Sequence, residues 1–376
     1  MMNLIKGPIY EHEQTKKLLH FLPKRSIVFL WHEDLDGVAV DGLINAQVKA
    51  VVNGRASMTG SYPQQHVNTL LQAGIPVFDV ISSAKQEKPY QGEEAIIFQD
   101  ELYVDNKDFE PIFVATLLPY TKGMIEEKTN QAQTNYSAQY DKFVRNTLRY
   151  AEKECGWFQQ IPDIPLSFAA IDKKEVFIVA RNTHYEKDIK AVRHALMRKG
   201  TVIVAVDGAA DGLLKHKIIP DYIIGDMDSI SEQAVYCGAQ LICHEHPNGT
   251  SPGKERLENM GLIVETIRFV GTSEDVAITA TYWSGASRLY LIGCRIGMTE
   301  FLEKGRAGMG STWLCRIQAG DKITDLKGIH QLAHSSIFSI HGQRQNSLKP
   351  SLLETIQQLV SERFGGWRKK EVLRHD

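Results

Sequence analysis

The sequence is poor in cysteine, in excess charge and in long apolar runs, and each shortage argues against a class of protein. Its five cysteines are scattered, with no close pair, which fits reduced thiols in a cytoplasm better than a disulfide or zinc framework. The formal net charge is only −2, so no broad basic field favours a nucleic acid partner. No stretch approaches the roughly 18 consecutive apolar residues of a membrane span, and the first residues lack the apolar core of a signal peptide. We therefore expect a cytoplasmic protein with no membrane span and no bound nucleic acid.

The length and composition are those of a soluble chain with more than one domain. The chain has 376 residues, of which 43% are hydrophobic and 23% are charged, and such lengths usually divide into two domains. Apolar periodicity, prolines and polar stretches predict an α/β fold in four segments. These are a small α/β domain, a helical connector, a domain with a parallel sheet and an amphipathic tail, at 1–118, 119–165, 166–333 and 334–376.

Short apolar runs predict strands, and runs with helical spacing predict helices between them. In the first domain we predict strands at 26–31, 50–52, 75–80, 96–98, 101–104 and 112–115, and helices at 38–46 and 67–73. A polar helix at 139–154 connects the domains. In the second domain we predict strands at 175–180, 201–206, 222–224, 239–243, 266–270 and 288–292, with helices such as 187–198 and 209–215 between them. This alternation predicts a parallel sheet.

Two consecutive strands of the second domain end in acidic turns. The residues that follow them are Asp207, Gly208, Gly225, Asp226, Asp228 and Ser229. In open α/β sheets, ligands bind at the carboxyl ends of the strands. Asp207, Asp226 and Asp228 would repel one another there unless a cation neutralised them, and Mg²⁺ held by carboxylates and phosphate oxygens is a natural occupant. Ordinary turn and helix-cap roles for these residues are the alternative.

Two further motifs offer groups that can hold a phosphate. Thr272 and Ser273 follow the strand at 266–270, and either can cap the next helix. The segment at 304–312 combines glycines with basic side chains, so its backbone amides and its charges can hold an anion. Its candidate residues are Arg306, Gly308, Gly310 and Ser311, of which Ser311 can also cap the following helix. A plain turn between two helices is the alternative for this segment.

The first domain carries weaker signals. Asp34 and Asp36 follow its first predicted strand and are interpreted as turn and helix-cap residues, and His66 as a surface histidine. The order of elements is similar to that of swivelling phosphohistidine domains, so we expect a binding or regulatory role. The segment at 347–376 has an apolar stripe and basic residues. Such a stripe suits docking on the protein itself or on a partner, or peripheral contact with an anionic membrane surface.

Longer motifs carry a family resemblance. VDGAADGLL and PDYIIGDMDS resemble the catalytic core of thiamin pyrophosphokinases, which has a DGG-type turn followed by a GD-x-DS segment. Most of the chain is similar to the SteA family of bacterial proteins, which is associated with cell division and cell separation. The similar stretches include DLDGVAVDGLINAQVKAVVN, GSYP, AGIPVFD, GTSEDVA and EFLEKGRAGMGST. The resemblance implies a thiamin pyrophosphokinase-like nucleotide-binding domain at 166–333, preceded by a smaller α/β domain of the swivelling type.

The resemblance also implies roles for single residues. Four aspartates match kinase carboxylates and would be catalytic, the first three as Mg²⁺ ligands that orient ATP: Asp207, Asp226, Asp228 and Asp275. The sequence departs from the kinases at Gly271 and Thr272, which stand where those enzymes have a Lys-Asp pair. Too few residues follow position 312 for the β-rich thiamin-binding domain of the kinases.

Two functions of different classes are therefore expected. In the first, the protein binds a nucleotide such as Mg-ATP and acts as a switch or scaffold in cell division or cell separation. It would contact other division proteins, at the division site or the membrane periphery, and a homo-oligomer is compatible with this role. In the second, the protein is an ATP-dependent diphosphotransferase, which transfers pyrophosphate to thiamin or to another acceptor.

Overall fold

The structure is a computed structural model that describes residues 4–83, 89–105, 110–228 and 230–333. Two compact units are present, Met1–Lys327 and Gly328–Asp376. The described part of the second unit contains the short helix α13, Ile329–Ala333. Ser229 and the predicted amphipathic tail at 334–376 lie outside the described residues. The predicted boundaries at 118 and 165 both fall inside the first unit, and the division into domains remains a prediction.

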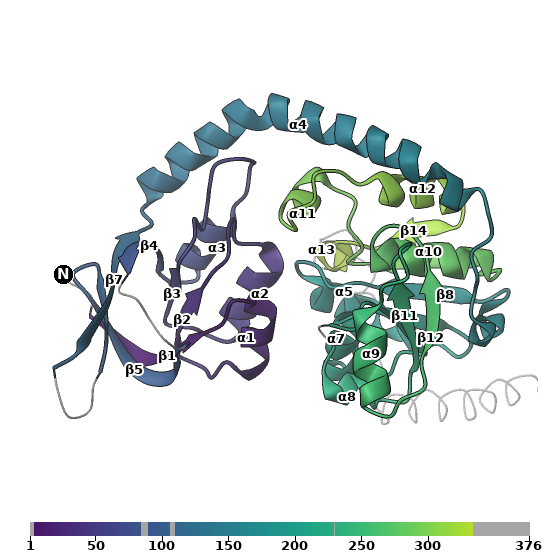
Figure 1. The fold of residues 1–376 in the computed structure, drawn as a ribbon, viewed down its shortest axis with the longest axis horizontal. Helices are drawn as coiled ribbons and strands as arrows, with labels where there is room; N and C mark the ends of the chain where they lie inside the picture. Colours follow the sequence, from purple (N-terminus) through teal and green to yellow (C-terminus); the bar gives the residue numbers. More distant parts are fainter. Residues whose placement is uncertain (1–3, 84–88, 106–109, 229, 334–376) are drawn as a thin grey trace, which may run out of the picture. The chain divides into compact units, whose positions relative to one another are not determined.

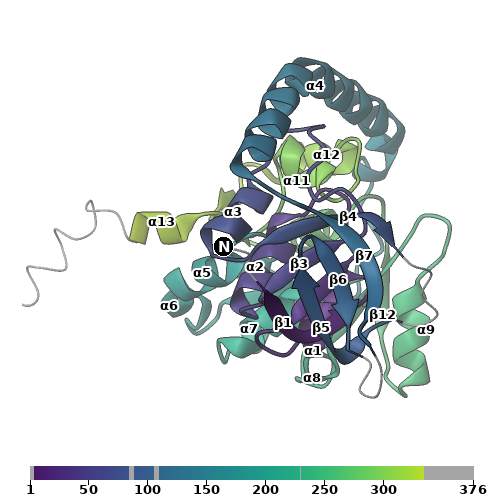
Figure 2. The same ribbon diagram turned by 90° about the vertical axis from the view of Figure 1, so that its left-hand side faces the viewer.

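The first sheet is a closed barrel (Figure 2). Its neighbouring strands follow the order β1-β2-β3-β4-β7-β6-β5. Its strands are β1 (Ile5–Glu11), β2 (Ile27–Leu30), β3 (Ala50–Asn53), β4 (Val77–Ser83), β5 (Gln91–Phe98), β6 (Glu101–Val104) and β7 (Ile112–Pro119). The pairs β1–β2, β2–β3 and β3–β4 are parallel. The pairs β4–β7, β7–β6 and β6–β5, and the pair β1–β5 that closes the barrel, are antiparallel. All six strands predicted for this region are present. β1 is missing from the prediction, because Gly7 and Pro8 interrupt its apolar pattern.

Alternating side chains give the barrel strands two buried faces. Ile27 and Phe29 of β2 belong to the core inside the barrel. Val28 and Leu30 point to the other face, and there they pack against helices. Three helices cover this face, α1 (Thr15–Phe21), α2 (Gly37–Asn45) and α3 (His66–Gln72) (Figure 1). The barrel region is therefore an α/β structure, as predicted. Its similarity to swivelling domains stays a prediction.

A single long helix, α4 (Lys122–Phe158), follows the barrel (Figure 1). The predicted connecting helix at 139–154 is confirmed but is extended at both ends, to 37 residues. Its buried residues Phe143, Thr147 and Ala151 recur every four positions and form one stripe. α4 packs against α12 (Gly310–Ala319). No helix in the described ranges is both long and apolar enough to cross a membrane.

The second sheet is parallel throughout, as the sequence predicts, in the order β12-β11-β10-β9-β8-β13-β14. Its strands are β8 (Glu175–Val179), β9 (Val202–Val206), β10 (Tyr222–Gly225), β11 (Gln240–Glu245), β12 (Glu265–Arg268), β13 (Arg288–Ile292) and β14 (Ile323–Asp325). The six predicted strands are confirmed, and the three-residue edge strand β14 is the one that was not expected. A 3₁₀ helix at Leu166–Ile171 precedes β8.

Helices cover both faces of this sheet (Figure 1). α10 (Ser273–Trp283), α12 and the end of α4 share one core with the sheet. The other core contains residues of α5 (Tyr185–Ala191), α6 (Arg193–Leu196), α7 (Ala209–Lys215), α8 (Glu232–Val235) and α9 (Pro252–Asn259). The helix predicted at 187–198 is two short helices, because the chain leaves helical geometry at Val192, where ψ is 16°. One more short helix, α11 (Met298–Leu302), follows β13.

Candidate functional site

A pocket of about 320 Å³ lies at the carboxyl edge of the parallel sheet, a size typical of small-molecule sites. Five strands end beside it and each is followed by a polar lining residue: Arg181 after β8, Asp207 after β9, Asp226 after β10, Thr272 after β12 and Arg295 after β13. The chain order reverses between β8 and its neighbour β13. Open sheets leave a crevice where strand order reverses, so the topology places the pocket here.

The rest of the lining mixes charged and apolar side chains. It consists of Lys16, Val38, Val206, Gly208, Asp228, Ser273, Glu274, Glu300, Phe301, Lys304 and Arg306. Lys16 comes from α1 and Val38 from α2, so helices of the barrel region contribute to the pocket. The pocket thus brings together seven of the residues predicted from sequence: Asp207, Gly208, Asp226, Asp228, Thr272, Ser273 and Arg306.

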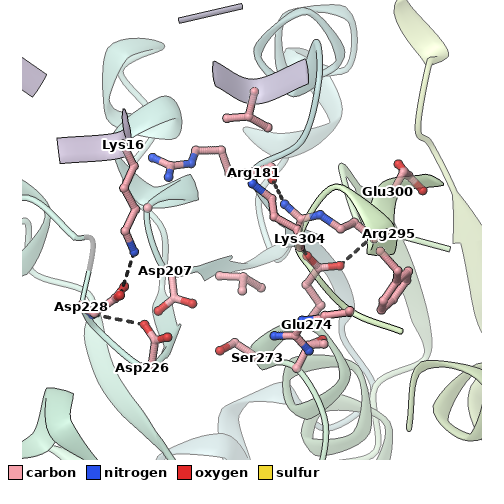
Figure 3. Close-up of a pocket in the computed structure, with 16 residues that line it drawn as sticks. Lys16, Arg181, Asp207, Asp226, Asp228, Ser273, Glu274, Arg295, Glu300 and Lys304 are labelled. Carbon is pink, nitrogen blue, oxygen red and sulfur yellow. Dashed lines mark hydrogen bonds and ion pairs between the residues drawn. The ribbon is translucent and has the colours of Figure 1, made fainter. Parts of the chain in front are cut away.

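Asp207 lies beside Asp226 on the acidic side of the pocket (Figure 3). Its backbone is left-handed, with φ at 46°, and its amide donates to the carbonyl of Ile224 at 3.0 Å. The Met227 amide donates to its carboxylate at 3.1 Å. Any side chain at Gly225 would overlap this carboxylate, which explains the glycine. Burial, followed by the charge of Asp226, raises the pKa of Asp207 to about 7.

Asp226 and Asp228 complete the acidic side. The Asp228 amide donates to the Asp226 carboxylate at 3.2 Å, and Lys16 Nζ lies 2.7 Å from the Asp228 carboxylate (Figure 3). Burial, followed by the contact with Asp228, raises the pKa of Asp226. These raised pKa values show that a cation would be favourable here. Among the described residues, no group of three or more His, Cys, Asp or Glu side chains is arranged to hold a metal by itself. The arrangement fits Mg²⁺ held by one or two carboxylates and completed by ligand oxygens and water.

Four basic side chains of the lining, Arg181, Arg295, Lys304 and Arg306, form what we call the basic side of the pocket. Arg181 and Arg306 form no side-chain hydrogen bond or ion pair with any residue that the structure describes. Lys304 donates to Asp36 of the barrel region at 2.7 Å. Arg295 pairs with the buried Glu274 and donates to the Arg181 carbonyl at 2.8 Å. Two of the four basic side chains are therefore held in place, and the two arginines without partners among the described residues can receive an anion.

Asp275 does not line the pocket. It is fully buried, and its carboxylate accepts from the Thr272 amide at 2.9 Å and from the hydroxyls of Ser311 and Thr312 at 2.8 and 3.0 Å. Thr272 caps α10 in return, as predicted, and the two residues form a capping box. Asp275 thus joins the first turn of α10 to the first turn of α12. It also fixes the loop that carries Thr272 and Ser273 into the pocket.

The residues of the segment at 304–312, which was predicted to hold an anion, have two different roles. Arg306 reaches the pocket, but a Cβ atom on Gly308 or Gly310 would meet the backbone of α4, so these glycines permit close helix packing. Ser311 was expected to cap α12. That expectation is wrong, because Met309 occupies the cap position and the Ser311 hydroxyl instead donates to Asp275. A buried acceptor that is distant in sequence has displaced the local capping role.

In the barrel region, the cap interpretation of Asp36 is confirmed. Its carboxylate accepts from the Ala39 amide at 2.8 Å at the start of α2. Asp34 joins the loop after β2 to the loop after β3, because its carboxylate accepts from the amide and hydroxyl of Thr59, both at 2.7 Å. His66 is half-buried rather than on the surface, and its Nε2 lies 2.7 Å from a Glu303 carboxylate oxygen.

Sequence reasoning missed two of the four residues of the basic side, Arg181 and Arg295. Arg181 directly follows one predicted strand, and Arg295 lies three residues beyond the end of another. Position at a carboxyl edge was therefore the signal that could have found them. Glu300 holds the turn before α11 by accepting from the Gly297 amide at 2.9 Å, and only its capping spacing indicated this role. No local signal marked Lys16, which lies 212 residues from Asp228 in the sequence.

Comparisons with known proteins concern the same part of the chain. Residues 193–246 match the family model described as thiamin pyrophosphokinase, catalytic domain; this segment includes Asp207, Asp226 and Asp228. A crystal structure of thiamine pyrophosphokinase from Bacillus subtilis is similar at 20% sequence identity, with a TM-score of 0.26. The match covers 40% of this chain and 59% of that chain, so this chain spans little more than half the length of that enzyme. A search of curated proteins finds no match.

Proposed function

We propose that this protein binds a nucleoside polyphosphate, with ATP and Mg²⁺ as the best fit, in the pocket at the carboxyl edge of its parallel sheet. The observation that carries the proposal is the division of the pocket into two sides of opposite charge. Asp207 and Asp226 have raised pKa values, which a cation would lower, while Arg181 and Arg306 have no side-chain partner among the described residues. A Mg²⁺-polyphosphate carries both charges that these two sides require.

Each side of the pocket would have its own task. Asp226 and Asp228, with Asp207 behind them, would hold Mg²⁺, which when bound neutralises phosphate charge and links the phosphates to the carboxylates. Arg181 and Arg306 would bind phosphate oxygens, because the guanidinium group suits bidentate contacts with phosphate. Thr272 and Ser273 would add neutral contacts from the start of α10. Asp275 would act as a positioning residue for this loop.

Within this proposal we favour a nucleotide-responsive switch or scaffold of bacterial cell division or cell separation, as the resemblance to SteA proteins suggests. Gly271 and Thr272 replace the Lys-Asp pair of the kinases, and Asp275 does not reach the pocket. Both observations favour binding over transfer. An active diphosphotransferase is the second candidate, and its support is the match of residues 193–246 to the kinase catalytic domain, with Asp207 and Asp226 lining the pocket.

The test is calorimetric titration of the purified full chain with ATP, ADP and AMP, with and without Mg²⁺. We expect Mg²⁺-dependent binding that Asp226→Asn and Asp228→Asn each weaken about tenfold or more, the effect of losing one charged contact. Asp141→Asn is the matched control, since Asp141 is an exposed carboxylate paired with Arg145 on α4. Equal affinity in the wild type and both pocket variants would refute the site.

A second assay separates the two candidates. AMP is measured in the same samples after incubation with Mg-ATP and thiamin. Binding without AMP release is expected for a switch or scaffold, whereas thiamin-dependent AMP release would establish the kinase.

A further inference from the structure

We propose that Lys16, which α1 of the barrel region carries into the pocket, is a polyphosphate-binding residue that exchanges Asp228 for the terminal phosphate when ligand binds. This inference rests on the proposed function and adds to it a ligand contact from the region outside the parallel sheet. It assigns the site a requirement for a chain of at least two phosphates with a divalent cation.

The first support is the placement of Lys16. Leu18 of the same helix is fully buried in the core between the barrel and its helices, which fixes the helix. Lys16 lies on another side, lines the pocket and reaches Asp228 at 2.7 Å (Figure 3). Its side chain is only 32% exposed, whereas the next residue, Lys17, is exposed and does not line the pocket. Of these two neighbouring lysines, only Lys16 therefore lies on the side of α1 that lines the pocket.

The second support is electrostatic. In the structure the Lys16 ammonium partly neutralises the acidic side formed by Asp226 and Asp228. A divalent cation would perform the same task more strongly, so Lys16 and Mg²⁺ compete for Asp228. The pair with Asp228 is also easily exchanged, because the Asp228 side chain is 50% exposed and exposed ion pairs are weak. With a divalent cation at Asp228, the phosphates of the ligand would place negative charge beside the Lys16 ammonium, which would then pair with them.

A second lysine shows the same dependence on the barrel region. Lys304, on the basic side of the pocket, is held at 2.7 Å by Asp36 at the start of α2. Asp36 is itself buried, with 5% of its surface exposed. The barrel region thus supplies one pocket cation directly and fixes another. A role in binding a large anion explains both contacts.

The experiment compares Lys16→Gln with Lys17→Gln, a control on the same helix that removes the same charge from an exposed position. Calorimetry measures the affinity for Mg²⁺ alone, for Mg-ATP, for Mg-tripolyphosphate and for AMP. For Lys16→Gln we expect about tenfold weaker binding of Mg-ATP and Mg-tripolyphosphate, the loss of one charge-assisted contact. We expect little change for AMP and tighter binding of Mg²⁺ alone, because a competing cation is gone. Lys17→Gln should match the wild type, and Lys16→Arg should restore most of the polyphosphate affinity.

An unchanged or increased affinity of Lys16→Gln for Mg-ATP would overturn the inference. If Lys16→Gln binds Mg-ATP as tightly as the wild type or more tightly, Lys16 is only a competitor that fills the site, while the proposed nucleotide site stands. If the wild type binds no polyphosphate, the proposed function fails and this inference fails with it. Thermal unfolding of each variant confirms that the fold is intact.

Discussion

In the part of the chain that the structure describes, the two sheets have the same number of strands, seven each, but arrange them in two different ways. The first sheet closes through the antiparallel pair of β1 and β5, so its strands have no free edge. The second sheet stays open and parallel, and the ends of five of its strands converge on one pocket. Because every strand of the open sheet runs the same way, polar residues after several strands meet at one edge. The open sheet builds the site, and helices beside the closed sheet complete it.

Aspartates have different roles in the barrel region and in the region of the open sheet, and the following predictions test this difference. Asp275 and Asp36 both accept from a backbone amide at the start of a helix, α10 and α2 respectively. Asp275 also accepts from two buried hydroxyls, whereas Asp36 pairs with the partly exposed Lys304. We therefore expect Asp275 to contribute more to the free energy of unfolding than Asp36.

The largest effect is expected for Asp275→Ala. The change leaves the Thr272 amide and the hydroxyls of Ser311 and Thr312 without their acceptor, and unpaired buried donors are costly. The free energy of unfolding should fall by about 3 to 4 kcal/mol, measured by urea denaturation. Asp141→Ala, at an exposed position, should change it little. A stable Asp275→Ala variant with lost nucleotide binding would instead indicate a direct role in the site.

The next effect concerns the pH dependence of stability through Asp207. Its folded-state pKa of about 7 lies above the ordinary value of 3.8, so the folded state binds the extra proton. The stability that the folded state gains from this proton is fully present below pH 4 and is lost as the pH rises through 7. Asp207→Asn should remove it and raise the free energy of unfolding at pH 8 by roughly 2 to 4 kcal/mol. Denaturation curves of both proteins at pH 5 and pH 8 measure the difference, and parallel pH profiles would contradict it.

The raised pKa of Asp207 also predicts how the affinity for the ligand changes with pH. Because Mg²⁺ needs ionised carboxylates, Mg²⁺-dependent nucleotide affinity should rise between pH 6 and pH 8. The same titrations at two pH values measure it. Binding that weakens over this range would argue against Asp207 as part of the cation side.

The smallest effect is expected in the barrel region, for Asp36→Ala. Loss of the cap on α2 should cost about 1 to 2 kcal/mol. Asp36→Asn is the matched control, because asparagine caps helices nearly as well but lacks the charge that holds Lys304. Urea denaturation should therefore show a larger loss for alanine than for asparagine. Equal losses would mean that the ion pair, rather than the cap, stabilises this region.

Much of the fold follows from the sequence alone. All twelve predicted strands are present, because strand positions depend on local apolar runs bounded by glycine, proline and polar residues. The parallel order of the second sheet also follows, since alternating strands and helices allow little else. Elements whose pattern is weak escaped prediction. β1 contains Gly7 and Pro8, and β14 is three residues long.

The candidate site was predictable where it depends on strand ends. Asp207, Asp226 and Asp228 follow consecutive strands of one parallel sheet, so their convergence is a property of local sequence and sheet direction. The positions of Asp275 and Gly310 were not predictable in this way. Both belong to polar motifs near strand or helix ends, but packing between α10, α12 and α4 turned them inward.

The sequence by itself therefore determined the strands, the parallel sheet and its acidic edge, because these depend on neighbouring residues and on a simple topological rule. The tertiary structure alone decided that the first sheet closes, that Asp275 is buried, and that Lys16 meets Asp228 from 212 residues away. Such contacts depend on how distant elements pack together, and no local pattern specifies which surfaces will meet.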